Sequence, residues 1–197
     1  MSTEDLQIES HPWPPFVPDG ARIMILGTFP PGSHRWSMDF YYPNRTNDFW
    51  RICGLLFMGN PDALYIKGER RFDKAAIREL MTERRIALGD TARKVRRLKG
   101  NASDKFLEIL TPIPLADVLD MMPDCHTLAT TGEKAASVIA DISGTSVPKM
   151  GEMVQVENFA GRNLDIWRMP STSRAFPMRL GQKAEYYKRL FCSAGVL

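Results

Sequence analysis

Asparagine side chains stand among aromatic rings in "YYPNRTNDFW", residues 41–50, where Tyr41, Tyr42 and Phe49 flank Asn47. Aromatic rings stack on the face of a flat heterocycle, and an amide hydrogen-bonds to its edge. This segment therefore predicts a pocket for a planar base. The alternative interpretation is structural: rings at the start of a helix belong to the core, and Asn47 is a helix N-cap.

Two further segments carry groups suited to phosphate. In "MPSTSR", the hydroxyls of Ser171, Thr172 and Ser173 can hold phosphate oxygens, although Ser and Thr also cap helices. In "GTFPPG", residues 27–32, glycine allows close approach of the backbone, and an ordinary turn is the alternative. The chain has no GxxxxGK[ST], GxGxxG or GxSxG pattern at these places, which argues against a P-loop NTPase, a nicotinamide enzyme and a serine hydrolase.

Four short apolar runs precede such segments and predict the strands that position them. Buried parallel strands read as nearly continuous apolar runs, and here they are expected at 21–27, 86–90, 125–132 and 163–170. Amphipathic helices are expected between and around them, at 46–59, 73–85, 115–124, 132–142 and 182–194. Since ligands bind at the carboxyl ends of parallel strands, "GTFPPG", "LGD", "ATTG" and "MPSTSR" should form the floor of one cleft.

The remaining segments give weaker signals. Residues 1–20 should be an extended lead-in to one domain spanning 1–197. The basic stretch 91–110 is expected to be a loop with part of a helix around 103–110. Basic clusters at 69–71, 82–85 and 91–100 attract a polyanion or are solvated helix faces, and the second interpretation has the higher prior when they are taken alone.

Composition limits the class of protein. The 197 residues are 44% hydrophobic with a net charge of +3, enough for a core. Three separated cysteines argue against a metal centre or a disulfide framework, and no cofactor is expected. Without an apolar run of spanning length or a secretory leader, we expect a monomeric cytoplasmic protein with no membrane partner. The three histidines form no evident triad; only His34 falls near the expected cleft.

The segments "ILGTFPPGS", "YYPNRTNDFW", "ATTGEKAA" and "MPSTSRA", in this order, resemble the uracil-DNA glycosylase superfamily, and most closely its hypoxanthine-DNA glycosylase-like branch. The resemblance implies a three-layer α/β/α sandwich with a central four-stranded parallel sheet. It also implies a monofunctional, metal-free DNA glycosylase that flips a deaminated base (hypoxanthine, uracil or xanthine) out of DNA for base-excision repair.

The resemblance also assigns roles by position. Asn47 would orient the attacking water. The base would be bound by Tyr41, Tyr42, Phe29, Phe49 and Thr131. The DNA phosphates would be bound by Gly27, Pro30, Pro31, Gly32, Ser171, Thr172, Ser173 and Arg174.

Two departures keep other functions open. Relatives with uracil activity place Asp or Asn inside the first turn, where this chain has Phe29, and many place an asparagine where it has Thr131. A threonine hydroxyl cannot hydrogen-bond two edge atoms as an amide does. The alternative hypothesis is a non-catalytic nucleic-acid or nucleotide binder that retains the fold. A third, weaker hypothesis is an enzyme acting on a phosphorylated small molecule.

Overall fold

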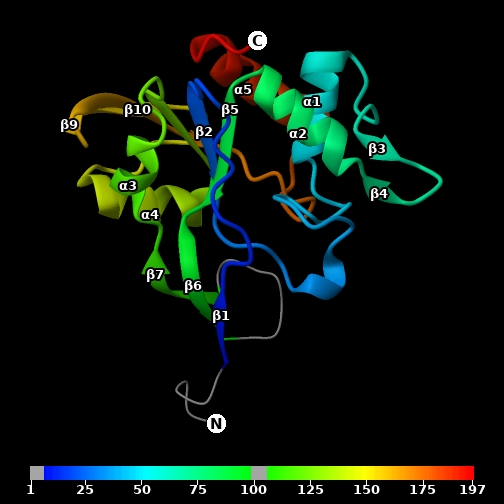
Figure 1. The fold of residues 1–197 in the computed structure, drawn as a ribbon, viewed down its shortest axis with the longest axis horizontal. Coiled ribbons are helices and arrows are strands. Elements are labelled where there is room, and N and C mark those ends of the chain that lie inside the picture. Colours follow the sequence, from blue (N-terminus) through cyan, green and yellow to red (C-terminus); the bar gives the residue numbers. More distant parts are fainter. Residues whose placement is uncertain (1–6, 99–105) are drawn as a thin grey trace.

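The computed structural model describes residues 7–98 and 106–197, and its centre is a five-stranded sheet between two layers of helices (Figure 1). The strand order is β5–β2–β8–β10–β9. The first four strands in this order pair in parallel, and β9 pairs antiparallel at the edge. The strands are β2 (Ile23–Gly27), β5 (Ile86–Asp90), β8 (Thr127–Thr131), β9 (Met153–Phe159) and β10 (Arg162–Met169). The expected α/β/α fold with four parallel strands is confirmed, and β9 is an addition.

Alternate residues of β2 show how the two helix layers are held. Ile23 and Ile25 pack into the apolar cluster beneath α1 (Phe49–Met58), α2 (Lys74–Glu83) and α5 (Leu180–Ser193). Met24 and Leu26 point to the opposite face, which is covered by α3 (Leu115–Asp120) and α4 (Glu133–Ser143). Side chains alternate between the faces of a strand, so a strand covered on both sides is apolar throughout.

Helix α1 begins one residue later than the N-cap expected from the sequence. Asp48 occupies the N-cap position, and Asn47 lies just outside the helix with its Oδ1 accepting from the Phe49 N–H at 2.9 Å. The far end was placed correctly: Gly59 closes the helix with φ of 69°, a left-handed conformation that glycine adopts without a steric penalty.

A second sheet extends from the carboxyl edge of the first. It contains β1 (Ile8–Ser10), β6 (Ala92–Arg97) and β7 (Leu107–Pro112), all antiparallel. The expectation of a loop and a helix in 91–110 was therefore wrong over its described part; residues 99–105 lie outside the described ranges. Buried Ala92, Val95 and Leu107 form a small apolar cluster, and this strand-like burial outweighs the high charge of the segment.

Two small elements complete the architecture near the edge where the parallel strands end. A 3-10 turn, η2 (Ser33–Arg35), follows β2, and a hairpin of β3 (Tyr65–Ile66) and β4 (Arg71–Phe72) projects between α1 and α2 (Figure 1). None of the helices in the described ranges is long and apolar enough to cross a membrane.

Candidate functional site

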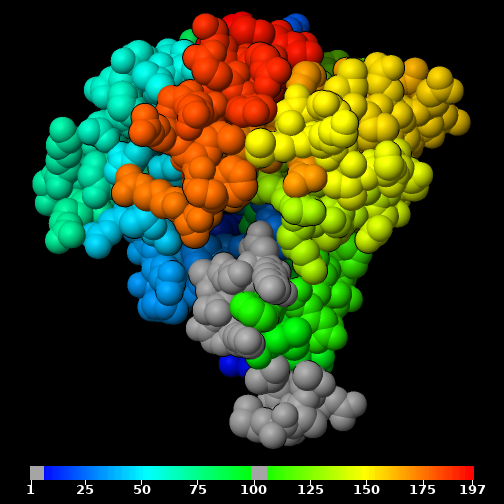
Figure 2. All heavy atoms as spheres, turned by 180° about the vertical axis from the view of Figure 1, so that it is seen from behind, coloured from blue at the N-terminus to red at the C-terminus, as the bar shows by residue number. Residues whose placement is uncertain are grey.

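The carboxyl ends of the parallel strands surround a cavity of about 140 Å³. On the face seen in Figure 2, the orange segment after β10, the yellow-green segment around the start of α4 and the blue segment after β2 come together. The residues that line the cavity are Gly27, Thr28, Phe29, Pro30, Pro31, Tyr42, Asn44, Asn47, Asp90, Thr131, Ser171, Thr172 and Ser173. The predicted strand ends therefore do meet in one cavity.

Gly27 and Asp90 end two neighbouring strands and lie side by side, as register partners of β2 and β5. A Cβ atom on Gly27 would overlap Asp90 Oδ1, so only glycine lets the carboxyl group approach the backbone here. The Gly27 backbone also hydrogen-bonds to that carboxyl group. Asp90 therefore contributes a fixed carboxyl group to the cavity floor.

Asp90 has a second partner, His11, which comes from the N-terminal lead-in. His11 Nε2 lies 2.8 Å from Asp90 Oδ2, and the imidazole is fully buried against the rings of Phe29 and Tyr41. Burial raises the pKa of Asp90, and the hydrogen bond and charge of His11, together with Arg93, oppose that rise. Sequence reasoning missed both residues; the one signal was the aspartate that ends the apolar run "IALGD".

The aromatic wall of the cavity is Tyr42 backed by Phe49. Tyr42 has a φ of 50°, an uncommon left-handed conformation for a bulky residue, and its ring lies 4.2 Å from that of Phe49. Its hydroxyl is 3.2 Å from Thr131 Oγ1. Burial, with the charge of Asp90 nearby, raises the pKa of Tyr42 well above its ordinary value. The phenol therefore keeps its proton and can donate it in a hydrogen bond.

Asn47 presents its amide to the cavity in a defined orientation. Only the oxygen of the amide can accept the Phe49 N–H, and this fixes which end is Oδ1. The two Nδ2–H donors are then the free end of the side chain. The structure thus combines the two readings of Asn47, since it organises the start of α1 and also lines the cavity.

A buried ion pair fixes the hydroxyl-rich loop beside Asn47. The Asp48 N–H donates to the Thr172 carbonyl at 2.8 Å, joining the two segments. Lys183 Nζ, on α5, donates to Asp48 Oδ2 at 2.9 Å and to the Ser173 carbonyl at 2.8 Å. The Lys183 side chain is fully buried and that of Asp48 is 8% exposed. This pair was not foreseen from sequence, because its partners are distant in the chain.

Four of the predicted site residues are not among those lining the cavity. Tyr41 is buried in the core, and its hydroxyl donates to the Pro14 carbonyl. Phe49 is also fully buried, behind Tyr42, and Gly32 follows the lining part of its loop. Arg174 turns toward Asp48, with Nε 3.3 Å from Oδ1. The lining residues that were not assigned in advance are Thr28, Asn44 and Asp90.

The chemistry of this cavity is that of proton transfer and hydrogen bonding. It contains a carboxyl group, an amide with free donors, a protonated phenol and several hydroxyls. Within residues 7–98 and 106–197, no three His, Cys, Asp or Glu side chains are grouped so that they could hold a metal ion. The arrangement suits a reaction in which a water molecule is held and loses a proton while a flat group leaves.

Comparison with known proteins relates the fold to one solved structure in particular. No family model matches the sequence, and no curated protein matches it. A solution NMR structure from Methanosarcina acetivorans, described as a "putative Uracil DNA glycosylase", is similar with a TM-score of 0.63 at 19% sequence identity. The match covers 96% of this chain and 99% of that one. The two chains therefore share an overall fold along nearly their full lengths.

Proposed function

We propose that this protein is a DNA glycosylase of base-excision repair, which hydrolyses the N-glycosidic bond of a flipped, deaminated base. The observation that carries the proposal is the cavity that brings Asn47, Asp90 and Tyr42 together beside the hydroxyls of Ser171 and Ser173. The fold shared with a described uracil DNA glycosylase supports it, as does the order of the four loop segments. The proposal includes membership of the uracil-DNA glycosylase superfamily.

The size of the cavity agrees with a single base as the bound group. Its volume of about 140 Å³ is close to the roughly 150 Å³ cavity that accepts one benzene ring and lies below the ~300 Å³ of sites for larger ligands. Uracil, with one ring, matches this volume; hypoxanthine and xanthine have two fused rings and require the loops to open. The loop segments resemble the hypoxanthine branch, so all three bases belong in the test.

The proposed reaction places a water molecule between a donor and an acceptor. Asn47 Nδ2 donates to the water oxygen, which bonds to the sugar carbon C1′ as the C1′–N bond breaks. The departing base takes the electron pair of that bond, and the Tyr42 hydroxyl donates a hydrogen bond to the charge that develops on it. The ionised Asp90 carboxylate accepts the proton that the water loses. The products are a free base and an abasic sugar.

The experiment that tests the function is abasic-site formation in oligonucleotides that contain uracil, hypoxanthine or xanthine. We expect release of at least one of these bases, and Asn47→Ala should reduce its single-turnover rate by about 10²–10³, the usual cost of one fixed hydrogen-bond donor. Asn60→Ala is the matched control, because Asn60 Oδ1 accepts from the Asp62 N–H at 2.9 Å in the same local geometry away from the cavity. Equal losses in the two variants would show that Asn47 has only a structural role.

The second candidate function is a non-catalytic DNA binder with the same fold. It is favoured by Phe29, whose ring lines the cavity where active relatives of the resembled superfamily have a polar group. Salt-sensitive DNA binding without release of any of the three bases would support this candidate and reject the glycosylase.

A further inference from the structure

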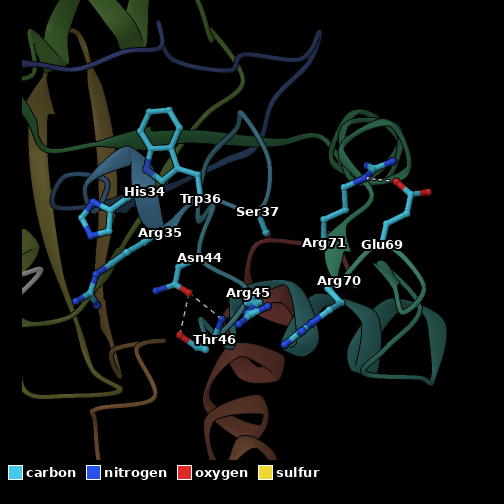
Figure 3. A pocket seen from close by; sticks show the side chains of 10 residues that line it. All are labelled: His34, Arg35, Trp36, Ser37, Asn44, Arg45, Thr46, Glu69, Arg70 and Arg71. Atoms are coloured by element: carbon cyan, nitrogen blue, oxygen red, sulfur yellow. Dashed lines mark hydrogen bonds and ion pairs between the residues drawn. The ribbon is translucent and has the colours of Figure 1, made fainter.

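A second and larger cavity, of about 660 Å³, opens beside the first. Its lining comes from three segments: the turn η2 and the residues after it, the stretch that leads into α1, and the tip of the β3–β4 hairpin (Figure 3). We call it the arginine groove; its members are His34, Arg35, Trp36, Ser37, Asn44, Arg45, Thr46, Glu69, Arg70 and Arg71. We infer that the arginine groove binds the DNA phosphates that flank the flipped nucleotide, an inference that rests on the proposed function.

The charge of the groove is strongly positive and largely uncompensated. Arg71 Nε is paired with Glu69 Oε2 at 2.6 Å. For Arg35, Arg45 and Arg70, all exposed, no ion pair or side-chain hydrogen bond occurs within the described ranges. Three guanidinium groups around one concavity repel one another and attract a polyanion, and guanidinium matches phosphate geometry by donating two parallel hydrogen bonds.

The arginines of the basic segment 91–98 differ, because most are already engaged. Arg96 pairs with Glu108 at 2.8 Å, and Arg97 with Glu9 at 2.7 Å. Arg93 donates to the Trp13 carbonyl. This segment has the higher density of positive charge in the sequence, but its described arginines support the β1–β6–β7 sheet. The available charge therefore lies in the groove.

The groove is continuous with the first cavity. Asn44 lines both cavities, and its Oδ1 accepts from the Thr46 N–H at 3.0 Å and from Thr46 Oγ1 at 2.9 Å, which fixes the segment between them. On the other side, Trp36 Nε1 donates to the Pro31 carbonyl at 2.7 Å and so attaches the groove wall to the first loop. A nucleotide whose base enters the first cavity thus has its neighbouring phosphates next to the arginines. This continuity favours DNA as the ligand over an unrelated polyanion.

The first test is the salt dependence of binding to a fluorescent duplex that carries a central tetrahydrofuran abasic site, so that the identity of the base does not matter. The variant is Arg35→Gln/Arg45→Gln/Arg70→Gln. Each phosphate contact contributes about 0.9 to the slope of log K against log[salt], so the slope should decrease by roughly 2–3 and affinity in 0.1 M salt by about 10²–10³. A slope within error of the wild-type value would overturn the inference.

The matched control is Arg85→Gln, which also removes an exposed positive charge. Arg85 immediately precedes β5, at the opposite edge of the parallel sheet from the groove. Its slope should remain within error of wild type. A loss per charge as large as that in the groove variant would show that binding follows net charge alone and would overturn the assignment to the groove. Unchanged melting temperatures in both variants ensure that folding is not the cause.

The second test locates the contacts on the DNA. Neutralising single phosphates as methylphosphonates beside the abasic site should weaken binding of the wild-type protein by about eightfold per contact in 0.1 M relative to 1 M salt. The same substitutions should have no further effect on the triple variant, because the contact is already lost. Equal effects on both proteins would place these phosphates elsewhere and overturn the inference.

The two proposals can fail separately in these experiments. Binding that depends on the groove, without release of any base, supports the groove and rejects the glycosylase. Base release with a normal salt slope in the triple variant supports the glycosylase and rejects the groove. Absence of DNA binding by the wild-type protein at low salt overturns the groove directly.

Discussion

Replacing Lys183 by Met should destabilise the protein strongly, because it leaves a buried carboxylate without its main partner. Lys183 is fully buried and holds both Asp48 Oδ2 and the Ser173 carbonyl. Breaking a buried ion pair from one side costs about 3–5 kcal/mol. Arg174, which is half exposed and 3.3 Å from Asp48 Oδ1, retains some of the compensation and favours the lower part of that range. For a chain of this size, the melting temperature should fall by roughly 6–20 °C.

Urea unfolding of wild type and variant measures this loss directly, with the slope m checked for equality. Lys188→Met is the control: it removes an exposed lysine from the same helix and should change the free energy of unfolding by no more than about 0.5 kcal/mol. Asp48→Asn added to Lys183→Met should recover part of the loss, since no buried charge then remains unpaired. A loss below about 1 kcal/mol, or no recovery in the double variant, would refute the reasoning.

Two further predictions concern the carboxyl group in the cavity. Burial raises the pKa of Asp90 above its ordinary 3.8, so the carboxylate needed to accept a proton is lost as the pH falls through the raised value; base release should decline on that acid side, and Asp90→Asn should lose this limb and about 10²–10⁴ in rate. Folding stability has the opposite sign: the contribution of Asp90 is full at low pH and lost as the pH rises through its folded pKa, which urea curves of wild type and Asp90→Asn can measure. Gly27→Ala should displace the carboxyl group, destabilise by about 1–3 kcal/mol and impair base release, whereas Gly181→Ala, with open space around its Cβ position, should do neither.

The parallel sheet could be predicted because each strand carries its own signal. "ARIMILG" and "IALGD" are apolar throughout, since both faces of β2 and β5 are covered, and that pattern is local in the sequence. The antiparallel strands could not be predicted in the same way. In β6 only Ala92 and Val95 are buried, and the arginines between them are stabilised by Glu9 and Glu108 from other strands. A pattern that depends on distant partners has no local signature.

The same distinction applies to the cavity. Its glycine-proline turn, its amide and its hydroxyl loop stand in segments that are unusual in themselves, and they could be selected from composition. Tyr41 and Tyr42 are equivalent in the sequence, but the left-handed φ of Tyr42 turns consecutive side chains to different places, one into the cavity and one into the core. His11 lies 79 residues from Asp90, in a lead-in with no evident role before the fold is known.

The position of Asp90 alters what the first turn implies about activity. Phe29 occupies that turn where a polar group was expected, and taken by sequence this argues against hydrolysis. Strands β2 and β5 are parallel neighbours, however, and their last residues, Gly27 and Asp90, are register partners. A side chain that ends one strand therefore reaches the space beside the turn that follows the other. The absence of an Asx residue from the first turn is thus no evidence that the cavity lacks a proton acceptor, and base release by a chain with Phe29 at this point requires only that the Asp90 carboxylate remain ionised.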